Sequence, residues 1–242
     1  MRHVALALAG VAIGVSLGAQ SPEKELVAAI ASNVIDNGIV SEVAWDGSLL
    51  VIQTAAMQRD GQLSPRYFTA PGPGMSLKHL SSAPPGLEDY WRKKSSRISP
   101  TGLGRITSFT DSKMPMVGIG ALERRLLEAN QMGGVDVVFE LRLGHLLLHS
   151  RKLVEPYDGE VWAWSPARLN RIAYVDGRGD LWIARADGSD AERIARGDFT
   201  LPAWSEDGRL LAIAERKNGG KRWEISVLHL AERYRDVDGR RE

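Results

Sequence analysis

The stretch Val161-Trp-Ala-Trp-Ser-Pro166 returns in altered form as Leu201-Pro-Ala-Trp-Ser-Glu-Asp-Gly208. The two tryptophans that precede serine, at positions 164 and 204, lie 40 residues apart, and each is followed by two more short apolar runs. A spacing of roughly 40 to 45 residues is the length of one four-stranded blade of a β-propeller. Residues 158–230 are therefore predicted to form two successive blades.

Weaker copies of the same pattern precede this stretch. Trp45-Asp46-Gly47 with the apolar run 49–52 predicts an earlier blade, and in residues 98–102 Ile98 replaces the tryptophan while Ser99-Pro100 remains. A further candidate copy at 139–148 starts too close to Trp164 for a complete blade, so either two strands are missing or the register of residues 86–160 differs. Residues 121–130 suit a helix as well as an outer strand. The predicted repeat positions are Trp45, Asp46, Gly47, Ser99, Pro100, Trp164, Ser165, Pro166, Trp204, Ser205, Asp207 and Gly208.

Seven Asp-Gly dipeptides support many tight turns between antiparallel strands, because Asp-Gly favours the positive backbone angles of type I′ hairpins. The fold class predicted is mostly β: a small or incomplete β-propeller of about four to five antiparallel blades over residues 41–230, preceded by one short N-terminal helix. The polar, arginine-rich residues 231–242 are predicted to be a tail.

The amino terminus has the pattern of an export signal. A basic start is followed by a small, apolar run to Ala19, and the chain then becomes polar, which predicts a signal peptide over residues 1–19. A membrane anchor is the alternative, although the run is short for a spanning helix. After cleavage we expect no transmembrane span and a periplasmic or secreted location. Residues 20–40 are predicted to be a helix, from Pro22 to about Ile35, and a linker, because apolar residues recur there at helical spacing.

Composition excludes some classes of partner and site. With 43% hydrophobic and 25% charged residues and a net charge of +1, the chain has an ordinary globular composition and lacks the basic excess typical of nucleic-acid binding. The absence of cysteine excludes disulfides, thiolate metal sites and a lipid-modified cysteine.

The repeats resemble those of TolB-type, WD40-like β-propellers, whose unit runs apolar-x-Trp-Ser-Pro-Asp-Gly before the next strand. The resemblance is strong over residues 161–230, fair over 43–80 and weak between 86 and 151. It implies that the motif residues specify blade architecture, that the tryptophans pack between sheets, and that the protein has a periplasmic protein partner. No segment able to close the ring is visible, so an irregular small propeller, an open arc and an array completed by a second chain remain open.

Several short motifs that could indicate catalysis, metal binding or ligand binding have simpler structural explanations. Gly14-x-Ser-x-Gly18 lies in the signal peptide, and the histidines at 145 and 149 are too far apart on a strand to share a metal. Residues 178–180, Arg-Gly-Asp, fit a hairpin turn, and residues 236–239 lack the first carboxylate of a calcium loop. Tyr90 to Lys94, with Arg97, mixes aromatic and cationic residues as sites for nucleic acid or an anionic surface do, but a solvated loop between blades is favoured.

We therefore predict a non-catalytic binding module without cofactor or metal, whose partner is a protein, with a peptide or glycan as alternatives. Rigid scaffolds that gather loops on one face suit recognition. The competing hypothesis is a propeller hydrolase or lyase that acts on a glycan or peptide, with Asp136, Glu140 and Asp198 as candidate acids.

Overall fold

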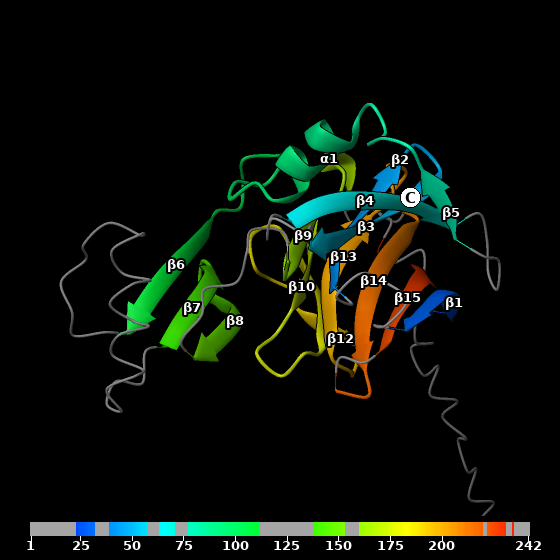
Figure 1. Ribbon diagram of the computed structural model, residues 1–242. Helices are drawn as coiled ribbons and strands as arrows, with labels where there is room; N and C mark the ends of the chain where they lie inside the picture. The colour runs from blue at the N-terminus through cyan, green and yellow to red at the C-terminus, as the bar shows by residue number, and fades with distance from the viewer. Residues whose placement is uncertain are drawn as a thin grey trace, which may run out of the picture.

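A computed structural model describes residues 23–31, 39–57, 63–70, 77–111, 138–152, 160–219 and 222–230, together with Tyr234. Over these residues the chain forms strands β1 to β15, the helix α1 (Leu87–Lys94) and a short 3₁₀ helix at Ala167–Leu169 (Figure 1). The prediction of a mostly β fold is confirmed. The predicted signal peptide, residues 121–130, Asp136 and residues 236–239 lie outside the described residues.

Every sheet is antiparallel and has three or four strands, and we number the sheets as blades in chain order. Blade 1 contains β2 (Ile39–Asp46), β3 (Leu49–Met57), β4 (Leu63–Ala70) and β5 (Lys78–Leu80). Blade 2 contains β6 (Ile106–Asp111), β7 (Val138–Leu143) and β8 (Leu146–Lys152). Blade 3 contains β9 (Trp162–Trp164), β10 (Arg171–Val175), β11 (Leu181–Arg185) and β12 (Glu192–Ala195). Blade 4 contains β13 (Phe199–Trp204), β14 (Leu210–Lys217), β15 (Arg222–His229) and β1 (Glu23–Ala31).

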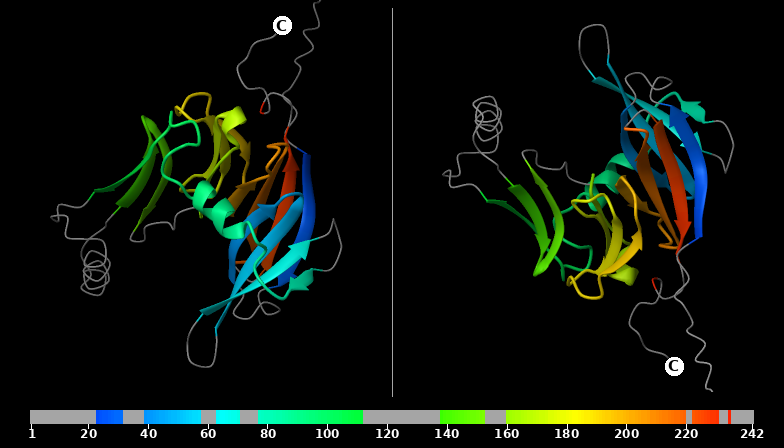
Figure 2. Two further views of the ribbon diagram at one scale, coloured as in Figure 1. Left: turned by 90° about the horizontal axis from the view of Figure 1, so that it is seen from above. Right: turned by 90° about the horizontal axis from the view of Figure 1, so that it is seen from below.

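The four blades pack face to face as an open arc. β13 of blade 4 contacts both β9 of blade 3 and β2 of blade 1, and β10 of blade 3 contacts β8 of blade 2. The spatial order is therefore blade 2, blade 3, blade 4, blade 1, with blades 2 and 1 at opposite ends (Figure 2). One apolar core fills the contacts among blades 2, 3 and 4, and a second lies between blades 4 and 1. The fold is thus propeller-like and incomplete.

The prediction of a helix from Pro22 to about Ile35 is wrong. Residues 23–31 form β1, which pairs antiparallel with β15 from Glu23 opposite His229 to Ala31 opposite Arg222. Without β1, β15 would be an exposed edge with unpaired backbone N–H and C=O groups. Pairing with β15, about 200 residues away in the sequence, therefore outweighs the helix preference that the spacing of the apolar residues indicates. Blade 4 is therefore completed by a strand from the other end of the chain.

Blade 2 explains why the sequence register was ambiguous. Its innermost strand is reduced to a single bridge between Ile98 and Arg105, so residues 139–148 are not the start of a blade but belong to its last two strands, β7 and β8. The helix α1 precedes the bridge. The prediction of a loop over Tyr90 to Lys94 is therefore wrong, although the helix carries a sequence signal: acidic residues in its first turn and basic residues in its last turn.

None of the helices in the described residues is long and apolar enough to span a membrane.

Candidate functional site

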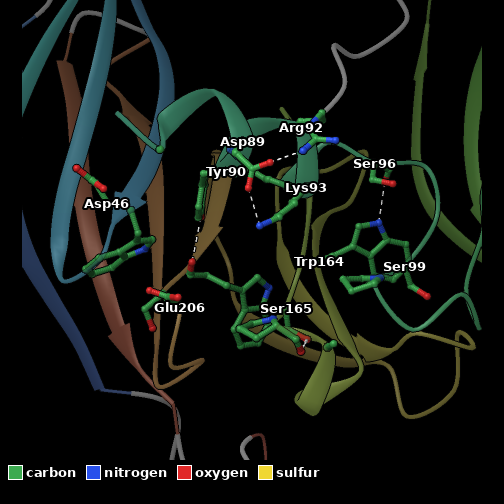
Figure 3. A pocket seen from close by; sticks show the side chains of 18 of the residues that line it. Asp46, Asp89, Tyr90, Arg92, Lys93, Ser96, Ser99, Trp164, Ser165 and Glu206 are labelled. Carbon is green, nitrogen blue, oxygen red and sulfur yellow. Dashed lines mark hydrogen bonds and ion pairs between the residues drawn. The ribbon is translucent and has the colours of Figure 1, made fainter. Parts of the chain in front are cut away.

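A cleft of about 810 Å³ opens between α1 and the ends of the inner strands of blades 1, 3 and 4 (Figure 3). Its walls include the repeat tryptophans Trp45, Trp164 and Trp204, while α1 forms the opposite side and the turn after Ile98 closes one end. Of the predicted repeat positions, all but Asp207 and Gly208 line the cleft, although Asp207 and Gly208 belong to the same turn as Ser205. The residues that the sequence analysis assigned to blade architecture therefore also line this cleft.

The tryptophans connect the blades through a repeated hydrogen bond. In each case the indole N–H donates to a backbone carbonyl of the next blade along the arc, or of the segment that leads into it. The bonds run from Trp45 to Ala203 at 3.0 Å, from Trp204 to Ala163 at 3.1 Å and from Trp164 to Ser96 at 2.7 Å. In the first two bonds the acceptor immediately precedes the next repeat tryptophan. The series thus follows the spatial order of the blades from 1 to 4, 3 and 2.

These indoles are structural walls rather than exposed stacking platforms. Trp45, Trp164 and Trp204 are only 6%, 5% and 2% exposed. At the end of the series Ile98 occupies the repeat position in blade 2 and is 50% exposed. Because isoleucine has no side-chain N–H, this position cannot extend the series to another blade. The arc therefore ends where the repeated hydrogen bond ends.

The repeat serines hold the turns beside the cleft. In each turn the serine N–H donates to a carbonyl five or six residues ahead, and the serine Oγ accepts the N–H of that same residue. The pairs are Ser99 with Gly104, Ser165 with Arg171 and Ser205 with Leu210, with N···O distances of 2.8 to 3.0 Å. Serine suits this position because its short side chain reaches the local backbone.

In blade 4, Asp207 adds a third group to the turn. Its Oδ1 accepts the Ser205 hydroxyl at 2.6 Å and the Arg209 N–H at 3.0 Å. Partial burial alone would raise the pKa of Asp207. The hydrogen bonds to the ionised carboxylate and the nearby charges of Arg209 and Arg168 outweigh this effect, so that the pKa of Asp207 is lowered. The carboxylate is thus engaged in shaping the turn.

The helix α1 is anchored over the cleft by two buried polar contacts. The Tyr90 hydroxyl donates to the Trp204 carbonyl at 3.0 Å (Figure 3). Burial, followed by the nearby Glu42 charge, raises the pKa of Tyr90 well above its usual value. Lys94, 4% exposed, forms an ion pair with Glu42 and donates to the Val43 carbonyl at 3.3 Å. Both contacts fasten α1 to blades 4 and 1.

On the rim of the cleft, Asp89 balances two cations of the same helix. Arg92 and Lys93 both form ion pairs with it, Lys93 at 2.6 Å (Figure 3). Their hydrogen bonds, Lys93 first and Arg92 second, lower the pKa of Asp89. All three side chains are substantially exposed, so these pairs add little stability.

Two further carboxylates line the cleft without a cationic partner among the described residues: Asp46 at the end of β2 and Glu206 in the turn after β13. Glu206 is exposed. Asp46 lies near the start of α1: a Cβ atom added to Gly86 would be 3.6 Å from the Oδ1 atom of Asp46. Sequence reasoning missed Glu206. A comparison of the repeats within the chain could have found it, because blades 2 and 3 have Pro100 and Pro166 at the equivalent position after serine, where blade 4 has glutamate.

The other predicted candidates do not gather at this cleft. Glu140 pairs with Arg142 at 2.7 Å in blade 2, and Asp198 pairs with Arg216 at 2.8 Å beside a second, smaller cavity. His145 is an exposed turn residue, whereas His149 is buried, with Nδ1 2.9 Å from the Val175 carbonyl. Residues 178–180 form the turn between β10 and β11, as expected.

A metal site does not emerge from the described part of the chain, where no three His, Cys, Asp or Glu side chains gather closely enough to hold an ion.

Comparison with known proteins gives a weak structural likeness. No protein-family model matches the chain, and no curated protein matches it. Among solved structures, a thermostable family-43 glycoside hydrolase is similar with 8% sequence identity and a TM-score of 0.24, over 82% of this chain and 74% of that protein.

Proposed function

We propose that this protein is an exported, non-catalytic recognition module that binds a segment of a partner protein in the cleft beneath α1. The observation that carries the proposal is that residues from all four described blades and from α1 line one open cleft of about 810 Å³. Ligand sites commonly have volumes of roughly 300–1,000 Å³, with apolar walls and a few polar groups.

The chemistry of the cleft supports binding rather than turnover. The hydroxyl groups of the three repeat serines form hydrogen bonds within their turns, and the indole N–H groups of the three tryptophans donate hydrogen bonds to neighbouring blades or to the segment that leads into one. A nucleophilic serine needs an effective base within hydrogen-bond reach. The partners of these serines are backbone groups, the Thr101 hydroxyl for Ser99 and, for Ser205, the Asp207 carboxylate, whose lowered pKa makes it a weak base. The cleft thus offers shape, aromatic walls and a charged rim.

The proposal includes the cellular location of the protein. The export-type amino terminus and the TolB-like spacing of the repeats support a partner in the cell envelope. Polypeptide is the favoured ligand because the cleft is an open groove between elements, suited to an extended chain.

The test compares two tryptophan substitutions at exposed alanines. Ala167→Trp places a large side chain in the cleft, whereas Ala191→Trp adds the same group away from it. A random peptide library displayed on phage is selected against the purified protein, and affinities of enriched peptides are measured by fluorescence anisotropy. We expect Ala167→Trp to weaken binding at least tenfold and Ala191→Trp to leave it unchanged.

The competing enzymatic hypothesis is tested on the same samples. Turnover of glycan or peptide substrates that Ala167→Trp abolishes, with no enriched peptide, would replace the binding proposal with a hydrolase or lyase.

A further inference from the structure

Glu206 departs from the pattern of its own repeat without any benefit to the turn. Equivalent positions in blades 2 and 3 hold Pro100 and Pro166, and those turns form the same serine-centred hydrogen bonds. In blade 4 the turn is made by Ser205, Asp207 and Leu210. A glutamate at this place is therefore not required by the fold, and its side chain is left exposed at the cleft.

The charges around the cleft leave one region uncompensated. On the α1 side, Lys94 is paired with Glu42, and Arg92 and Lys93 share Asp89. By contrast, neither Glu206 nor Asp46 has a cationic partner within the described ranges, and they come from the adjacent blades 4 and 1. Asp46 lies at the end of β2 near the start of α1, and Glu206 lies in the turn after β13, so the uncompensated carboxylates of the cleft come from two places on its lining (Figure 3).

This environment suits a long cationic side chain. Lysine and arginine place an apolar stem against apolar surface while the charged end reaches a carboxylate. The cleft supplies indole walls and, next to them, two carboxylates from different blades. A neutral or acidic side chain would leave these carboxylates without a counter-charge.

We propose that Glu206, with Asp46 elsewhere in the same cleft lining, makes the cleft selective for a polypeptide segment that presents lysine or arginine. The inference rests on the proposed function and names the chemistry of its ligand. Glu206 is the specificity-determining residue, and Asp46 reinforces it from the neighbouring blade.

The experiment uses libraries of tetrapeptides blocked at both ends, in which one position is fixed as Lys, Arg, Gln or Glu. Binding to the full chain is measured by fluorescence anisotropy at low and high salt. We expect the Lys and Arg libraries to bind at least tenfold more tightly than the Gln library, and the difference to shrink at high salt because exposed charges are screened.

Two variants remove the carboxylate. Glu206→Pro reproduces the turn of blades 2 and 3, and Glu206→Gln keeps the side-chain size; both are expected to lose most of the Lys and Arg preference without loss of thermal stability. Glu88→Gln, which neutralises an exposed carboxylate of α1 outside the cleft lining, is the control and should change neither.

The failures are distinguishable. If the Gln library binds as well as the Lys library and Ala167→Trp abolishes both, the binding module stands and the charge selectivity is overturned. If no library binds, both proposals fail. Spermidine that competes at the same concentration as the Lys library would show recognition of free amines and overturn the assignment of a polypeptide ligand.

Discussion

Single indole N–H groups hold neighbouring blades together, and their contribution can be isolated. Trp204 donates to Ala163, whereas Trp162, fully buried in the same core, has an indole nitrogen without a hydrogen-bond partner among the described residues. Trp204→Phe and Trp162→Phe remove similar ring area, but only Trp204→Phe leaves a buried carbonyl without its donor. We expect Trp204→Phe to lower the free energy of unfolding by about 1–2 kcal/mol more than Trp162→Phe, as measured by urea unfolding. Equal losses would show that ring packing alone joins the blades.

At the same scale, the sequence identified architecture better than recognition. Trp45, Trp164 and Trp204 occupy equivalent places because each indole must reach a neighbouring backbone, which fixes both residue type and spacing. Glu206 escaped notice because an exposed side chain that plays no part in its own turn leaves no periodic signal. Its place in the cleft lining appears only in the folded structure.

At the scale of elements, the buried ion pair between Lys94 and Glu42 is expected to fix α1 over the cleft. Lys94→Met would leave Glu42 largely buried without its partner, which costs roughly 3 kcal/mol for such pairs. The double variant Lys94→Met/Glu42→Leu is expected to recover much of that loss, because it removes both charges. Urea unfolding gives the global effect, and hydrogen exchange of residues 87–94 should accelerate most in the single variant.

A double variant that is less stable than Lys94→Met would contradict this account and show that the pair contributes net attraction. Lys93→Met is the matched control, because Lys93 is 72% exposed and its pair with Asp89 should contribute little.

Element boundaries were predictable where local chemistry decides them. Asp-Gly and Ser-Pro pairs predicted tight turns. Of the pairs within the described residues, Asp-Gly at 46, 176, 187 and 207 and Ser-Pro at 99 and 165 lie at a strand end or between strands or bridge residues, as expected. For β1 the local pattern pointed to a helix, and only pairing with β15 decides the outcome. For α1 the acidic first turn and basic last turn were present in the sequence, but the expectation of a regular blade favoured a loop.

At the scale of the whole molecule, β1 joins the two ends of the chain. Removal of residues 1–31 would expose the edge of β15, whereas removal of residues 1–22 would retain β1. We expect the longer deletion to cost several kcal/mol, a fall in Tm of about 10 °C or more for a chain of this size. Sheet edges also pair between molecules, so the longer deletion should self-associate with rising concentration in light scattering. Identical behaviour of the two deletions would show that β1 is dispensable.

The two blades at the ends of the arc, blades 2 and 1, differ in their contacts from the blades between them. On blade 2 the ion pair between Arg142 and Glu140 lies in the sheet that ends the row, and Ile98 replaces the tryptophan that would reach a further blade. On blade 1, α1 packs through Leu87 against Ala44 and Val51. Repeat arrays commonly end in units with polar or covered outer faces. The sequence repeats predicted the blades, whereas these features of the two end blades were not predicted.

The pairing of β1 with β15 also sets an order of events during synthesis. Residues 23–31 leave the ribosome long before residues 222–229 exist, so the first strand to be made is among the last to find its place. Contacts so distant in sequence form slowly, because the chain entropy of closing the intervening loop must be overcome first. Blades 1 and 3, built from neighbouring segments, can form earlier. Completion of blade 4 thus requires synthesis to have passed β15, and a chain truncated before β15 would keep β1 unpaired and open to proteolysis.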